Sequence, residues 1–85
     1  MNPEENLIMY KSDDMYYFDE ESGLKNWTIR EIKTDDERIP TLVHRKKYNK
    51  LGNITIIRNH DTESFTRQIK HICFWQNFVM ITWMC

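Results

Sequence analysis

The sequence predicts an α+β fold, with a small antiparallel sheet of four to six short strands and one C-terminal amphipathic helix. Three observations support this prediction. Aromatic and β-branched runs alternate with polar turns in the first sixty residues, the segment Asn53–Arg58 carries three isoleucines, and apolar residues recur at helical spacing between residues 62 and 75. Because 85 residues are enough for one hydrophobic core and too few for two, we expect a single domain covering residues 1–85.

The first half of the chain favours a three-stranded meander. Residues 7–10 and 15–18 are apolar, aromatic runs separated by the turn-forming residues 11–14, which is typical of a β-hairpin. Residues 27–32 alternate between polar and apolar side chains and predict a third strand.

In the middle of the chain, Pro40 biases Ile39 toward extended backbone and precedes a short strand over residues 41–44. A basic turn follows, in which Gly52 can adopt a positive φ. The next strand, Asn53–Arg58, is the best supported in the chain, because its isoleucines suit a buried pleated surface.

The C-terminal part predicts a helix over residues 62–75, with Asp61 or Thr62 as its cap and Phe65, Ile69 and Ile72 on one face. Residues 78–85 are apolar on every side, so either this helix continues or a break at residues 76–77 is followed by a final strand. The abundance of Phe, Val, Ile, Thr and Trp favours the strand.

Composition indicates a cytoplasmic protein. No apolar run is long enough to span a membrane, the N-terminus lacks the pattern of a signal peptide, and two cysteines are too few for a disulfide framework. The chain contains no alanine and is rich in residues specified by A/T-rich codons, which suggests a viral or phage accessory protein acting in the host cytoplasm. Residues 1–37 hold eleven acids and four bases, whereas residues 38–85 hold eight bases and two acids, so the halves carry net charges of −7 and +6.

Candidate catalytic and metal-binding residues have simpler structural explanations. His60, Asp61 and Ser64 are close in sequence, but Asp61 and Ser64 are what the start of a helix requires. Zinc would need His60, His71, Cys73 and Cys85, whose spacing matches no known finger. We therefore predict no enzymatic activity, no metal and no cofactor.

The leading hypothesis is a non-enzymatic protein-binding module that modulates a host protein. Exposed aromatic side chains on a small sheet can dock a peptide, and the chain offers Tyr16, Tyr17 and Trp27 beside the acidic Asp19, Glu20 and Glu21. The stretch from Met15 to Trp27 resembles the second and third strands of a WW domain. That resemblance implies an aromatic hairpin in which Tyr17 and Trp27 line a groove for proline-rich peptides.

Two alternatives remain open. A small nucleic-acid-binding protein would use the basic segment at residues 44–50, in which positive charges that neutralise phosphates surround one aromatic ring; its candidate residues are Arg45, Lys46, Lys47, Tyr48 and Lys50. A homodimer could form through the apolar end of the chain, from Phe78 to Met84.

Overall fold

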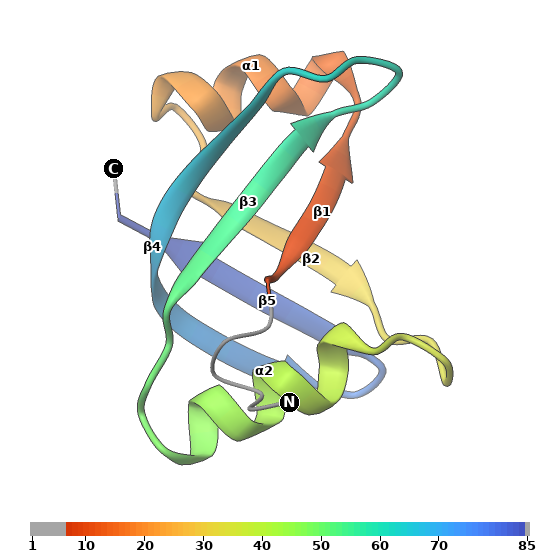
Figure 1. The fold of residues 1–85 in the computed structure, drawn as a ribbon, viewed down its shortest axis with the longest axis vertical. Helices are drawn as coiled ribbons and strands as arrows, with labels where there is room; N and C mark the ends of the chain where they lie inside the picture. Colours follow the sequence, from red (N-terminus) through yellow and green to blue (C-terminus); the bar gives the residue numbers. More distant parts are fainter. Residues whose placement is uncertain (1–6, 85) are drawn as a thin grey trace.

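A single curled sheet wraps around the hydrophobic core, and two helices lie at opposite ends of the curl (Figure 1). The computed structural model describes residues 7–84. The elements follow one another as β1 (Met9–Ser12), α1 (Asp14–Ser22), β2 (Trp27–Glu31), α2 (Arg38–Lys47), β3 (Asn53–Arg58), β4 (Ser64–Trp75) and β5 (Phe78–Trp83). The α+β class and the five-stranded sheet agree with the sequence prediction, but both helices precede β3 and neither is C-terminal.

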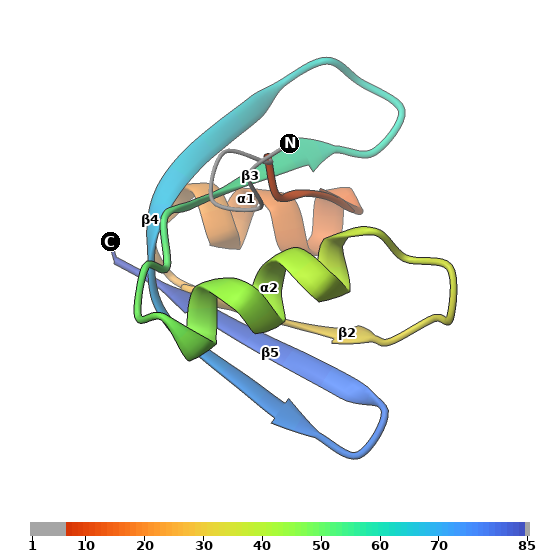
Figure 2. The ribbon, with the colours of Figure 1, turned by 60° about the horizontal axis from the view of Figure 1, so that its bottom comes forward.

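The sheet is mixed rather than purely antiparallel. Its strand order is β1-β3-β4-β5-β2, with β1 parallel to β3 and every other neighbouring pair antiparallel. The first half of the long strand β4 pairs with β3 and the second half with β5. A bulge between Ile69 and His71 separates the halves, and bulges bend strands, which fits the sharp curl in Figure 2.

The predicted helix over residues 62–75 is wrong, because the bulge in β4 imitates helical spacing. In a regular strand, Phe65 and Ile69 share a face, and residue 71 would be next on that face. Lys70 is an extra residue without a partner on β5, so the next side chain that points toward the core is that of Ile72 and not that of His71. Phe65, Ile69 and Ile72 are all buried, at the same intervals of four and three residues that an amphipathic helix would show.

The predicted hairpin over residues 7–18 is also wrong, and with it the three-stranded meander. Residues 15–18 lie in α1, where Tyr17 and Glu20 are three residues apart and both point inward. The helix ends at Gly23, whose φ of 90° suits glycine. A strand at residues 27–31 is confirmed, but it pairs with β5 instead of the preceding segment. Because residues 14–22 are helical, the stretch that resembles a WW domain does not form its two strands.

Residues 41–44 belong to α2 and not to a strand. Pro40 lies in the first turn of this helix, where a backbone N–H has no partner within the helix and proline is tolerated. Three predictions for the rest of the chain are confirmed: Gly52 has a φ of 67°, β3 covers Asn53–Arg58, and the segment after the turn at residues 76–77 is a strand.

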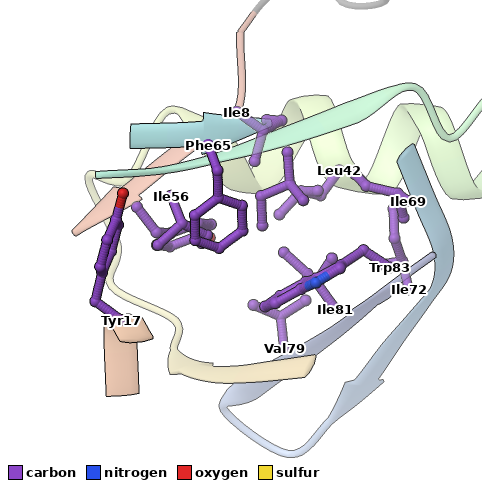
Figure 3. Close-up of a cluster of buried hydrophobic side chains, with 12 residues drawn as sticks. Ile8, Tyr17, Leu42, Ile56, Phe65, Ile69, Ile72, Val79, Ile81 and Trp83 are labelled. Carbon is purple, nitrogen blue, oxygen red and sulfur yellow. The ribbon is translucent and has the colours of Figure 1, made fainter. Parts of the chain in front are cut away.

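The core collects side chains from all seven elements except β2, together with Ile8 just before β1 (Figure 3). Trp83 and Phe65 lie near its centre, and α2 contributes Leu42 from one side. The apolar end of the chain is therefore a central strand whose Val79, Ile81 and Trp83 are used for folding. Cys85 lies outside the described residues.

Deletion of Lys70 tests the role of the bulge. Without this residue, Ile69, His71 and Ile72 become consecutive and pair regularly with β5, so the alternation of side chains is kept but the bend between the two halves of β4 is lost. Since the curl around the core depends on that bend, we expect the unfolding free energy to fall by about 1–3 kcal/mol, measured by urea denaturation. The control Lys70→Met keeps the register and changes stability by less than about 0.5 kcal/mol. Equal stabilities for the deletion and the control would contradict the bulge.

Candidate protein-binding surface

The two edge strands of the sheet, β1 and β2, face each other without pairing. On β1, the carbonyl oxygens of Ile8 and Ser12 accept hydrogen bonds from β3 and the residue after it, so the carbonyls of Met9 and Lys11 point outward. Arg30 of β2 donates to Lys11 O at 2.9 Å, and Arg38 of α2 donates to Met9 O at 2.7 Å. Side chains thus cap the outward carbonyls of β1 in place of a neighbouring strand.

The ring of Tyr10 packs against the guanidinium groups of both arginines. Its ring centroid lies 3.9 Å from the guanidinium carbon of Arg38 and 4.9 Å from that of Arg30. The side chain is only 3% exposed, and its hydroxyl has no hydrogen-bond partner among the described residues. Burial raises the pKa of the Tyr10 hydroxyl, and Arg38 opposes this change only in part.

The outer edge of β2 has no strand beside it in the described part of the chain. The amide N–H of Trp83 donates to Asn26 O, and that of Ile32 donates to Asn77 O. Residues 26 and 32 thus direct their backbone groups toward β5, and in an antiparallel pair every second residue between them does the same. Thr28 and Arg30 use their backbone groups toward β5. The N–H and C=O groups of Trp27, Ile29 and Glu31 therefore point away from the sheet.

A cavity of about 400 Å³ runs along this edge, which we call the β2 trough. One wall is four consecutive residues of β2, and the opposite wall combines the end of β1 with α1. The lining residues are Lys11, Ser12, Asp13, Tyr16, Glu20, Lys25, Trp27, Thr28, Ile29, Arg30 and Asn59.

The ammonium group of Lys25 lies between two aromatic rings and a carboxylate in the β2 trough. Lys25 Nζ lies 4.4 Å from the ring centroid of Trp27 and 5.2 Å from that of Tyr16. The same atom donates to Glu20 Oε2 at 2.7 Å. Glu20 is 1% exposed, and its Oε1 has no hydrogen-bond partner among the described residues. Such a buried carboxylate oxygen is a strong hydrogen-bond acceptor.

The structure brings together half of the residues predicted for protein binding. Tyr16 and Trp27, 49% and 42% exposed, lie in the β2 trough with Glu20. Tyr17 is in the core, with its ring centroid 5.5 Å from that of Phe65. Asp19 and Glu21 are exposed on α1 but do not line the trough.

The residues predicted for nucleic-acid binding are spread over different environments. Arg45 is buried and donates to the carbonyls of Leu51 and Asn53, which anchors the turn after α2. Lys46 Nζ donates to Ile72 O, whereas Lys47 lies over the exposed ring of Tyr48. Lys50 is exposed. This arrangement leaves a smaller basic surface than the sequence suggested.

Sequence reasoning missed a second surface, the side of β2, β5 and the end of β4 that faces away from the core. Strand register places six apolar side chains there: Trp27, Ile29, Cys73, Trp75, Phe78 and Met80. We call this surface the outer face. In Figure 2 both helices lie on the opposite side of β2 and β5. Alternation within residues 27–31 and 78–83 was the available signal, but the pairing of these two segments was not visible.

No group of three or more His, Cys, Asp or Glu side chains within residues 7–84 could hold a metal ion. No helix in this range is long and apolar enough to cross a membrane. No protein-family model, curated protein or solved structure matches the chain.

The Lys25–Glu20 pair gives the first test of the site. Lys25→Met leaves the buried Glu20 carboxylate without its donor, so we expect a loss of about 1–3 kcal/mol in unfolding free energy. Glu20→Gln added to Lys25→Met should recover at least half of that loss, because it removes the uncompensated charge. Thermal and urea unfolding of the single and double variants measure both effects. No loss in Lys25→Met would show that the pair is not formed.

Tyr10→Phe tests the environment between the edge strands. At neutral pH we expect stability within about 1 kcal/mol of the wild type, because the deleted hydroxyl has no partner in the described structure. Since the pKa of Tyr10 is raised by folding, its contribution is complete below the unfolded-state pKa of about 10 and declines as pH rises through the folded-state pKa. The variant should therefore lose less stability than the wild type above about pH 10. Some alkaline loss should persist, because burial also raises the pKa of Tyr17. Equal alkaline losses in both proteins would be evidence against this environment.

Proposed function

We propose that this chain is a non-enzymatic protein-binding module that takes an extended peptide as an added strand on β2. The observation that carries the proposal is the open edge of β2 beside the β2 trough. An edge strand with free N–H and C=O groups can pair with a partner's backbone, while neighbouring pockets select its side chains.

The difference between the two edges supports β2 as the docking strand. The outward carbonyls of β1 at Met9 and Lys11 already have arginine partners. On β2, Trp27 and Ile29 present outward backbone groups directly to the cavity. A peptide entering the β2 trough would therefore find its backbone partners on β2.

The chemistry of the trough indicates which side chains such a peptide would present. Tyr16 and Trp27 offer aromatic faces, and Glu20 Oε1 offers a buried acceptor. Alternate side chains of an added strand point to the same side, so one residue in two would face these groups. A residue with an apolar stem and a hydrogen-bond donor at its end matches both features.

The non-enzymatic part of the proposal is supported by the arrangement of the candidate triad. His60 and Asp61 lie in the exposed turn between β3 and β4, and Ser64 is the exposed first residue of β4. Asp61 Oδ1 accepts hydrogen bonds from the N–H groups of Thr62 and Glu63, which is a turn-stabilising role.

The test uses a library of random peptides panned against the full chain. Selected peptides are then measured on Ile29→Pro, which removes one outward N–H of β2 and introduces a ring at the pairing edge. Edge strands tolerate proline at such positions, so the fold should persist. We expect peptide affinity to fall at least about tenfold.

Ile29→Ala is the matched control, because it also truncates the side chain on the outer face but keeps the N–H. It should retain peptide affinity within about threefold. Circular dichroism checks that both variants are folded. The proposal fails if no peptide is enriched over a blank surface, or if the selected peptides bind Ile29→Pro and Ile29→Ala equally well.

A further inference from the structure

The outer face is an ordered array, and its composition follows from the strand register. Reading across β2, β5 and β4, the three rows are Trp27, Thr82 and His71; Ile29, Met80 and Cys73; and Glu31, Phe78 and Trp75. Met80 is at the centre. Ile29 and Trp75 are 51% and 66% exposed, so the apolar character of the face is open to solvent in the described structure.

The size of the outer face indicates what kind of association it can support. With strands about 4.8 Å apart and rows about 6.8 Å apart, the nine side chains span roughly 300 Å². Six of the nine side chains are apolar, so the apolar part is roughly 200 Å², somewhat smaller than the ~300–600 Å² of the largest patch on a typical monomer, which is often an interaction site. The whole face is well below the ~800 Å² per partner of a standard stable complex, so the area indicates a weak, reversible association.

The positions of Glu31 and His71 on the outer face favour a second copy of this chain as its partner. Of the nine side chains, Glu31 is the one acid, and it lies at the corner diagonally opposite His71. Trp27 and Trp75 occupy the other two corners. A second copy related by a two-fold axis can place either its own Glu31 or its own His71 over these corners, depending on the direction of the axis.

One direction of the two-fold axis pairs Glu31 with His71 at both of these corners. If the axis runs through Met80 at about 45° to the strands, close to the diagonal from Trp27 to Trp75, Glu31 of each copy lies within about 3 Å of the position over His71 of the other. The imidazole can donate to the carboxylate in either of its protonation states. The other diagonal opposes Glu31 to Glu31, and an axis along or across the strands leaves Glu31 against tryptophan. The favourable axis makes the strands of the two sheets cross at nearly 90°, one of the two common sheet-packing angles.

We propose that the outer face binds a second copy of this chain through two reciprocal Glu31–His71 contacts around a central Met80 pair. The inference does not rest on peptide binding, although Trp27 and Ile29 belong to both the β2 trough and the outer face. It also replaces the dimer predicted through Phe78 to Met84, because half of that segment is core and the outward half is only one column of the interface.

Charge exchange tests the proposal directly. Sedimentation equilibrium of the full chain, from low micromolar to millimolar concentration, should show a monomer–dimer equilibrium. Glu31→Lys and His71→Glu should each raise the dissociation constant at least about tenfold, because each disrupts two contacts per dimer. The double variant Glu31→Lys, His71→Glu should return to within about threefold of the wild type, since it restores both pairs with reversed sign.

A covalent test checks the position of the axis. In a Cys73→Ser, Cys85→Ser background, Met80→Cys should give a covalent dimer with a short bis-maleimide cross-linker, because packed sheets lie about 10 Å apart, whereas Val43→Cys on exposed α2 should not. A wild-type chain that stays monomeric at millimolar concentration would overturn the proposal and leave the face to a different protein. A dimer that both single variants and the double variant leave unchanged would overturn the assigned interface.

Discussion

Two arginine side chains hold together the edges of a sheet that does not close on itself. Arg30 reaches from β2 and Arg38 from α2, and each donates to a β1 carbonyl that would otherwise lack a partner. Both guanidinium groups pack on the ring of Tyr10, so their positions are fixed by the core as well as by hydrogen bonds. The β2 trough depends on this arrangement, because Arg30 ties the end of β1 to one side of the cavity and the backbone of β2 forms the other.

The elements that sequence could predict are those whose signal is local. The isoleucines of β3 predicted a strand by themselves, and the β-branched and aromatic residues of β5 favoured a strand over a continued helix, which the structure confirms. β4 was not predictable from periodicity, because the extra Lys70 converts a two-residue repeat into intervals of four and three. The two helices were not predicted, and the reason is different. Residues 15–18 have strand-like composition, but contacts made by Tyr17 with the core favour α1, and tertiary packing of this kind overrides intrinsic propensity.

The candidate site was predictable only where its residues are close in the chain. Tyr16 and Trp27 do lie near each other, yet they come from a helix and a strand and not from neighbouring strands. The buried carboxylate of Glu20 could not be distinguished in sequence from the exposed Asp19 and Glu21 beside it. The outer face was further out of reach, because it requires the register between β2 and β5, which are some fifty residues apart.

The two proposed surfaces share a strand, and this has an energetic consequence. A peptide paired with β2 would add a fourth column to the outer face, enlarging it from roughly 300 Å² to roughly 400 Å². If the second copy also contacts this new column, its affinity increases when the peptide is bound. Thermodynamic linkage then requires the dimer to bind the peptide more tightly than the monomer does, by the same factor. The curled sheet would thus couple recognition at its open edge to association at its outer side, with β2 as the element common to both and no change of conformation required.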